Sequence, residues 1–265
     1  MINLTNKTII HHPEQNYIQF RKLLEFPELI HCFTLKPLDF MSSHAEASAN
    51  AQLRLAAALG IPQDSFCKPQ QTHSDHIRIV GRSDAGILPP KLTDTDGCIS
   101  NESGLALLLT FADCTPLLFY DPVKRVIADI HSGWRGTLAR IGTKAVEKMK
   151  EQFGCDPSDL ICCIGPHLRK CHFEVDRDVF ELFEAEFADF GPADGFSSYR
   201  ADRNKYYIDT AAINMEMLRR AGLREENLCD CGICTVCHSK ICQSYRADKN
   251  DSGRSAAVIM LRTDR

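Results

Sequence analysis

The sequence predicts an α+β fold in which a mixed or antiparallel β-sheet is flanked by helices. Short apolar runs typical of strands occur in both halves of the chain, and segments with helical spacing lie between them. The two kinds of segment do not follow a strict strand–helix–strand alternation, which argues against a purely parallel sheet. The 265 residues, 44% of them hydrophobic, are enough to bury the core of one large domain or of two small ones.

Seven segments are predicted to be strands because each combines an apolar run with β-branched or aromatic residues. They are residues 29–36, 76–80, 105–111, 116–120, 126–131, 160–165 and 256–261. The fourth and fifth are separated by a segment containing Asp121 and Pro122, two residues that favour turns. We therefore expect these two strands to form a hairpin.

Four segments are predicted to be helical. The first ends at Gly60, and the last begins after Asp209 and ends at Gly222, because Asp suits a helix N-cap and Gly the left-handed position after the last turn. One buried helix face after residue 131 is indicated by apolar residues three or four positions apart, namely Leu138, Ile141, Ala145 and Met149. The other three helical segments are residues 45–60, 178–187 and 209–221.

Composition excludes several classes of function. The formal net charge is -4, so no basic excess is present for nucleic-acid binding. No apolar run reaches the length of a membrane span, and the N-terminal segment lacks the pattern of a secretory signal. The 13 cysteines are odd in number, and the chain is too long to need disulfides, so we expect free thiols in the reducing cytoplasm.

Three short segments carry residues of the kinds that bind zinc: residues 70–74 with His73, residues 112–116 with Cys114, and residues 131–136 with His131. Each ligand-type residue lies at the edge of a predicted strand, where side chains are held by the scaffold but open to substrate. Catalytic zinc commonly has three protein ligands and leaves one position to water or substrate. By spacing alone the trio is a weak signal, because the three residues are far apart in sequence and a lone His or Cys is more often structural.

Arginines near glycines form a second feature. Gly133 and Gly136 bracket Arg135 just before a predicted helix, where backbone N–H groups and a guanidinium could bind an anion. A solvated arginine in a tight turn is an equally good interpretation. Near the C-terminus, Arg246 and Arg254 flank a polar loop, and either a surface turn or a polar wall over the site fits this pattern.

Taken together, these motifs resemble the laccase-domain family of purine nucleoside phosphorylases, also called the YfiH family. The resemblance runs from about residue 29 to the end and is most specific in two segments, residues 112–116 (ADCTP) and 131–136 (HSGWRG). It also covers residues 71–73, 165–166, 171–175, 234–235, 244–246 and 253–254. The resemblance implies one domain over residues 1–265 with a central mixed sheet, similar in architecture to bacterial toxin deamidases.

The resemblance further implies a metal site at His73, Cys114 and His131, with zinc as the expected metal. Copper is possible, since two His and one Cys also suit copper. The implied reactions are phosphorolysis of adenosine, inosine, guanosine or methylthioadenosine, and deamination of adenosine. The partners would be a purine nucleoside and phosphate in the cytoplasm; the sequence predicts no particular oligomeric state.

Several residues are expected to have further roles. We expect Asp113 to move protons because it is adjacent to Cys114, and Cys114 and Arg246 to take part in the reaction. The residues expected to bind substrate are Lys36, Gln71, Arg135 and Arg246. Lys36 stands where the family usually has an arginine, and keeps the charge without the two-pronged geometry. Ser74 replaces a glycine that usually follows the first histidine. Both departures bear on the choice of substrate more than on metal binding.

Three other hypotheses compete. Cys114 and His131 could form the nucleophile and base of an amidase or other cysteine hydrolase acting on cell-wall precursors. A copper-dependent polyphenol oxidase is the second. The third concerns residues 229–238, where Cys229, Cys231, Cys234, Cys237 and His238 have spacings that resemble a structural zinc or iron–sulfur site.

Overall fold

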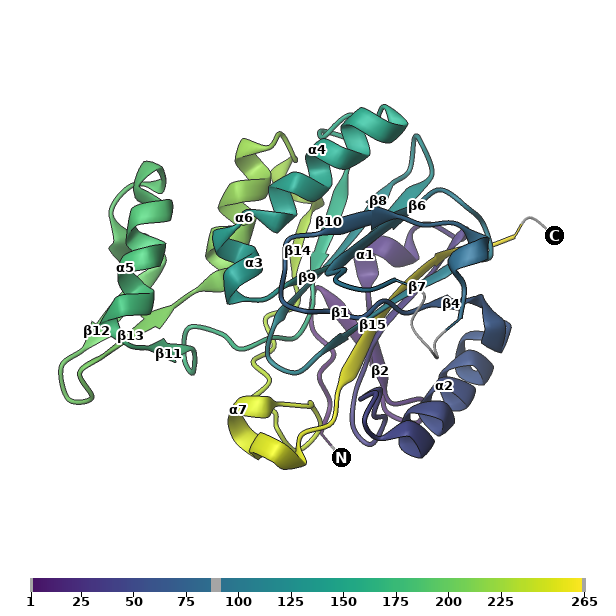
Figure 1. The fold of residues 1–265 in the computed structure, drawn as a ribbon, viewed down its shortest axis with the longest axis horizontal. Helices are drawn as coiled ribbons and strands as arrows, with labels where there is room; N and C mark the ends of the chain where they lie inside the picture. The colour runs from purple at the N-terminus through teal and green to yellow at the C-terminus, as the bar shows by residue number, and fades with distance from the viewer. Residues whose placement is uncertain (1, 87–91, 264–265) are drawn as a thin grey trace.

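Two six-stranded mixed sheets pack against each other at the centre of the computed structural model, which describes residues 2–86 and 92–263 (Figure 1). In the first sheet only the pairing of β4 with β7 is parallel, and the other pairs are antiparallel. Its strands, in spatial order, are β1 (Ile9–His12), β2 (Tyr17–Phe20), β3 (Leu29–Thr34), β15 (Ser255–Leu261), β7 (Ala106–Phe111) and β4 (Phe66–Cys67).

The second sheet has an antiparallel centre and a parallel pair at each edge, where β14 pairs with β10 and β5 with β6. Its strands, in spatial order, are β14 (Leu228–Asp230), β10 (Ile161–Ile164), β8 (Thr115–Asp121), β9 (Val126–Ser132), β6 (Gly97–Ser100) and β5 (Ile77–Ile79). The hairpin predicted around Asp121 and Pro122 is confirmed as β8 and β9.

The largest hydrophobic cluster lies between the two sheets. It joins Phe33 and Leu107 of the first sheet to Leu118 and Ile127 of the second, all of them at most 1% exposed. The central strands are covered on both faces, which is why they read as continuous apolar runs instead of alternating ones. Burial of this cluster fixes how the sheets face each other, and so fixes which strand ends meet.

Helices cover the outer faces. Helix α2 (Ala45–Leu59) packs on the first sheet and ends at Gly60, which has the left-handed φ of 66° expected there. Helices α4 (Ile141–Phe153) and α6 (Thr210–Arg220) pack on the second sheet. The predicted N-cap is confirmed, since Asp209 accepts a hydrogen bond from the N–H of Ala212. Among the described residues, no helix has the length and apolar character needed to cross a membrane.

A smaller unit projects from the body at the left of Figure 1. It consists of α5 (Arg177–Glu186) and a three-stranded sheet of β11 (Glu174–Val175), β13 (Lys205–Ile208) and β12 (Ser197–Arg200). Its hydrophobic cluster also includes residues of α3 (Trp134–Leu138) and α6. The remaining helices are short: α1 (Arg21–Leu24), α7 (Tyr245–Asp248) and the 3-10 turns Gln63–Ser65, Arg82–Asp84, Ala188–Phe190, Ala193–Gly195, Glu225–Asn227 and Lys249–Asp251.

Two predictions need correction. The helical segment after residue 131 is two helices, because Arg140 adopts a left-handed φ of 57° between α3 and α4. Leu138 therefore packs with the projecting unit, whereas Ile141 packs on the second sheet. The single central sheet that was expected is in fact two sheets. The expected strands are hydrogen-bonded into two separate sheets, and the apolar faces of these sheets pack against each other.

Candidate functional site

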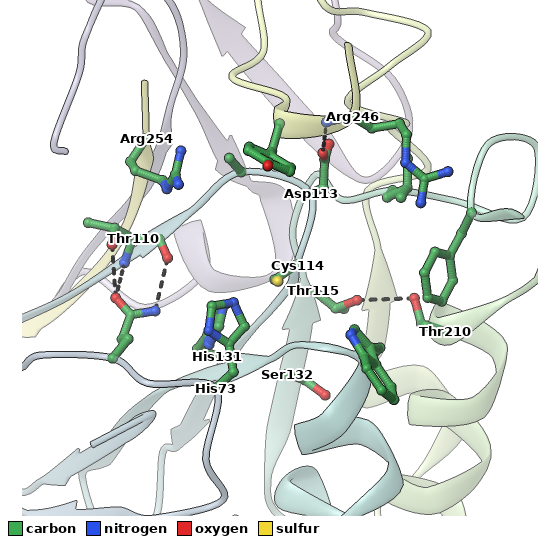
Figure 2. A pocket seen from close by; sticks show the side chains of 16 residues that line it. His73, Thr110, Asp113, Cys114, Thr115, His131, Ser132, Thr210, Arg246 and Arg254 are labelled. Carbon is green, nitrogen blue, oxygen red and sulfur yellow. Dashed lines mark hydrogen bonds between the residues drawn. The ribbon is translucent and has the colours of Figure 1, made fainter. Parts of the chain in front are cut away.

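His73, Cys114 and His131 come together at one edge of the two sheets. Their potential ligand atoms, one from each side chain, all lie within 4.8 Å of one another. His73 belongs to the loop between β4 and β5, Cys114 to the tight turn between β7 and β8, and His131 to the end of β9. Figure 2 shows the three side chains directed toward a common point at the base of a cavity.

The hairpin register explains the meeting of Cys114 and His131. Pro116 is paired with His131 across β8 and β9, so the turn that holds Cys114 lies beside the segment that follows β9. Gly133 occupies that segment, and a Cβ there would lie 3.3 Å from both the Cys114 sulfur and the His73 ring. A glycine therefore leaves room for the three ligand-type side chains to converge.

Asp96 holds two of the three residues in place. It is fully buried just before β6, and its Oδ1 lies 2.7 Å from Nδ1 of His131, which donates a hydrogen bond to it. The same carboxylate accepts the backbone N–H groups of Thr72, His73 and Ser74 at 3.1, 3.1 and 2.8 Å. It thereby stabilises the left-handed φ of 63° at His73 and leaves Nε2 of His131 free to bind a metal.

Electrostatics favour a charged Cys114–His131 pair. Burial opposes the charge on Cys114, but His131 and the hydrogen bonds from His131 and His73 lower the pKa of its thiol to about 6. Burial also opposes the charge on His131, but the Cys114 thiolate and the Asp96 carboxylate raise its pKa to about 9. Burial opposes the charge on Asp96 too, but the hydrogen bond from His131 and the positive charge of His131 outweigh it and lower the pKa of the Asp96 carboxyl. A thiolate at neutral pH is the form that binds metals.

The donor set fits a metal ion. One thiolate and two imidazoles are ligands that both zinc and copper accept, and three protein ligands leave a fourth position open. The buried Asp96 supplies the carboxylate behind a metal-binding histidine that is characteristic of such sites. The residues present could therefore hold a catalytic metal.

A cavity of about 500 Å³ opens above these residues, within the range of pockets that bind small molecules. Its floor is formed by His73, Cys114 and His131. Apolar side chains form part of its wall, namely Trp134, Leu168, Phe173 and Tyr245. Its polar lining is Gln71, Thr110, Asp113, Thr115, Ser132, Thr210, Arg246 and Arg254, several of which are labelled in Figure 2.

Gln71 and Asp113 line the cavity but are already engaged by the protein. The Gln71 side chain donates to the backbone carbonyl of Thr110 and accepts from its N–H and hydroxyl. The Asp113 carboxylate accepts hydrogen bonds from the hydroxyls of Thr235 and Ser244 and, at 2.6 Å, from the N–H of Arg246. Asp113 thus anchors the C-terminal loop to the turn that holds Cys114.

The structure separates the four predicted cationic residues into two pairs. Arg246 and Arg254 line the cavity. Lys36 does not: its ammonium lies 2.6 Å from the Asp248 carboxylate and donates to the carbonyl of Ser239. Arg135 is exposed, stacks 4.1 Å from the ring centre of Trp134, and is likewise not among the lining residues. The substrate-binding roles expected of Lys36 and Arg135 thus lack support from this geometry.

Sequence reasoning missed Asp96, Phe173 and Thr210. Asp96 stands in a run of Thr and Asp before a glycine, which reads as an ordinary turn, and only its contacts across the fold reveal its role. Phe173 was visible as part of a family-like motif, but nothing in the sequence places its ring in the cavity. Thr210 joins the wall because its hydroxyl lies 3.1 Å from that of Thr115.

The cysteine-rich segment 229–238 does not form one cluster. Cys231 is buried in the core between the sheets, and Cys229 packs against the same core. Cys234 and Cys237 instead lie beside Cys171 and His172 from a distant part of the chain. His238, the last residue of the predicted motif, is not in that group and contacts the carbonyl of Cys234.

Comparison with known proteins identifies the family and the fold. A family model for the multi-copper polyphenol oxidoreductase laccase matches residues 40–262, and the chain belongs to that family. Its fold matches a solved structure of YlmD from Geobacillus stearothermophilus with a TM-score of 0.87 and 25% identity, covering 97% of this chain and 100% of that one. The hypothetical protein YfiH of Bacillus licheniformis gives the same TM-score at 23% identity, with the same coverage of both chains.

Curated relatives indicate which enzymes the chain is similar to. It is 32% identical over 202 residues to the purine nucleoside phosphorylase YlmD of Bacillus subtilis, covering 75% of this chain and 71% of that protein. It is also 32% identical over 225 residues to a purine nucleoside phosphorylase of Deinococcus radiodurans, covering 84% of this chain and 81% of the relative.

Proposed function

We propose that this protein is a zinc-dependent purine nucleoside phosphorylase. The observation that carries the proposal is the convergence of His73, Cys114 and His131 at the base of a cavity that Arg246 also lines. Adenosine, inosine, guanosine and methylthioadenosine are the proposed nucleosides, and hydrolytic deamination of adenosine is a proposed second reaction. The names of the relatives favour this chemistry over an amidase or a polyphenol oxidase.

The cavity is suited to an aromatic base. Trp134, Phe173 and Tyr245 contribute rings to its lining, and stacking on such rings stabilises a base by about 1–3 kcal/mol. Hydroxyl groups in the lining, including those of Thr110 and Thr115, could hold the sugar. We place the anomeric carbon between this wall and the group of His73, Cys114 and His131, because Arg246 and Arg254 line the same cavity and could bring phosphate to it.

Two arginines are the proposed phosphate-binding groups. Arg246 donates through Nη1 to the carbonyl of His172 at 3.0 Å and through Nη2 to that of Glu174 at 3.4 Å, which fixes its guanidinium and leaves three N–H donors. Arg254 donates through Nη1 to the carbonyls of Ser252 and Gly253. A planar guanidinium held in this way binds phosphate through two parallel hydrogen bonds.

In the proposed reaction a phosphate oxygen forms a bond to the anomeric carbon while the bond to the purine nitrogen breaks. The electron pair of that bond goes to the purine, which takes up a proton, and the products are the free base and a sugar 1-phosphate. A bound zinc ion would supply Lewis-acid stabilisation of developing negative charge. Asp113 accepts three hydrogen bonds and is better suited to position Arg246 than to transfer a proton.

Product analysis tests the proposal. Purified zinc-loaded protein is incubated with adenosine, with and without phosphate, and the products are separated by chromatography. Adenine that appears only with phosphate supports phosphorolysis, and inosine that requires zinc supports deamination. The same assay with inosine, guanosine and methylthioadenosine measures release of the free base from each. If no free base and no deamination product forms from any of the four nucleosides, the proposed function is wrong and an amidase becomes the next hypothesis to test.

Arg246 and Arg135 allow a matched comparison of two arginines from the same set of motifs. We expect Arg246→Lys to raise the KM for phosphate by about 10–100-fold, because a lysine cannot form two parallel hydrogen bonds to one phosphate. Arg135→Lys should leave the KM unchanged, since Arg135 lies outside the cavity lining. Steady-state kinetics at varied phosphate concentration measures both KM values. A larger increase in KM for the Arg135 variant would indicate instead that phosphate binds at the start of α3.

The compartment and the domain organisation are part of the same proposal. All 13 cysteines are free, which fits a reducing compartment such as the cytoplasm. We further propose that residues 1–265 act as one domain, because the residues around the cavity come from both sheets and from the C-terminal loop.

A further inference from the structure

Four side chains of the kinds that bind zinc converge a second time, away from His73, Cys114 and His131. They are Cys171, His172, Cys234 and Cys237, and their potential ligand atoms all lie within 4.8 Å of one another. None of the four lines the cavity described above. Three thiols and one imidazole are a complete ligand set for a structural zinc ion.

The distances match a tetrahedral zinc site. Bonds of about 2.3 Å to sulfur and about 2.0 Å to nitrogen place sulfur atoms about 3.8 Å apart and a nitrogen about 3.5 Å from each sulfur. The sulfurs of Cys171 and Cys237 are 3.8 Å apart. Nδ1 of His172 lies 3.2, 3.6 and 3.5 Å from the sulfurs of Cys171, Cys234 and Cys237.

Two turns of the chain present these ligands. In the first, the N–H groups of His172 and Phe173 both donate to the carbonyl of Arg169 at 2.8 Å. In the second, the segment from Cys234 to Cys237 has the two-residue spacing typical of zinc-binding cysteine pairs. A parallel β-bridge between His167 and Cys234 holds the two turns side by side.

Neither a disulfide nor apolar packing accounts for this group of cysteines. A disulfide needs sulfur atoms about 2.05 Å apart, whereas Cys171 and Cys237 are 3.8 Å apart and free. Packing as a small apolar side chain explains the buried cysteines of this protein. It does not explain Cys171 and Cys237, which are the two exposed ones among the 13.

We propose that Cys171, His172, Cys234 and Cys237 bind a second, structural zinc ion. Because all four positions are filled by protein, this site is closed to substrate. It would tie the segment that carries Phe173 to the C-terminal segment, where Arg246 donates to the carbonyl of His172. The second zinc would thereby hold one wall of the cavity, and it does not depend on the function proposed for the first site.

Metal content per chain tests this site. After purification in reductant, zinc loading and removal of loosely bound metal, we expect two zinc ions per chain by mass spectrometry. Cys237→Ser and Cys114→Ala should each retain one, and the double variant none. His238→Asn is the matched control and should keep two, because the structure leaves His238 out of the four ligands.

X-ray absorption at the zinc edge on the unmodified protein decides the matter even if Cys237→Ser does not fold. The second site has three sulfur ligands and the first site has one, so the average over both sites is about two sulfur ligands per zinc. The first site alone would give one sulfur ligand per zinc. One zinc per chain, with one sulfur and lost in Cys114→Ala, would overturn the second site. So would two zinc ions in Cys237→Ser, or a Cys171–Cys237 disulfide in reduced protein. A single zinc lost only in Cys237→Ser would support this site and count against the first.

Discussion

Replacing Cys114 by alanine is expected to remove the metal from the first site and to lower turnover of purine nucleosides by about a thousand-fold or more. The variant loses the thiolate of the three-residue ligand set, and a catalytic metal contributes several kcal/mol to transition-state stabilisation, at about 1.4 kcal/mol for each factor of ten. Zinc content and product formation from adenosine are measured on the same preparation. A Cys114→Ala protein that has lost the zinc of the first site but keeps full activity would contradict the proposed function.

Alkylation with iodoacetamide shows whether Cys114 is a metal ligand or a catalytic nucleophile. In metal-free protein, Cys114 should react with iodoacetamide even near pH 7, because the pKa of its thiol is lowered to about 6, and the reaction should slow as the pH falls below that value. Zinc should protect Cys114, while the buried Cys162 should stay unreactive in both states because burial raises the pKa of its thiol. Alkylation that abolishes activity without displacing zinc would instead favour the cysteine hydrolase.

Asp96→Asn is expected to weaken zinc binding at the first site by about 10–100-fold, as loss of the carboxylate behind a metal-binding histidine commonly does. Both oxygens of the Asp96 carboxylate accept hydrogen bonds, from His131 and from the three N–H groups of residues 72–74. An asparagine replaces one of these oxygens by an NH2 group, which would point its hydrogens at one of these donors. The free energy of unfolding should fall by about 3 kcal/mol. Zinc competition with a chelator and chemical denaturation measure the two effects.

The stability effect of Asp96→Asn should depend on pH. Because its native contacts lower the pKa of Asp96, the carboxylate contributes stability above its unfolded pKa of about 4, and this is lost as the pH falls. The difference between wild type and variant should therefore be largest near neutral pH and should shrink in acid. Asp94→Asn is the control in the same loop: Asp94 is exposed, and its replacement should leave zinc affinity unchanged. Equal effects of the two variants would rule out a special role for Asp96.

Much of the architecture could be predicted from local signals. The α2 helix ends at Gly60 and α6 begins at the Asp209 cap, as expected, because these residues act within one turn of the chain. The hairpin β8–β9 follows from its turn residues and apolar runs in the same way. The break at Arg140 was not visible, because a single non-glycine residue with a left-handed φ leaves the apolar spacing of the sequence unchanged.

Sequence by itself determined the class of family, the strand-edge position of Cys114 and His131 and the presence of a cysteine-rich C-terminal segment, whereas His73 lies in the loop between β4 and β5. Tertiary structure decided which residues meet. Asp96 is joined to His73 and His131, Arg246 is separated from Arg135, and Cys234 and Cys237 are paired with Cys171 and His172 instead of their own neighbours. The physical reason is that these contacts depend on strand register and on how the two sheets pack, which are set by burial across the whole chain and not by local spacing.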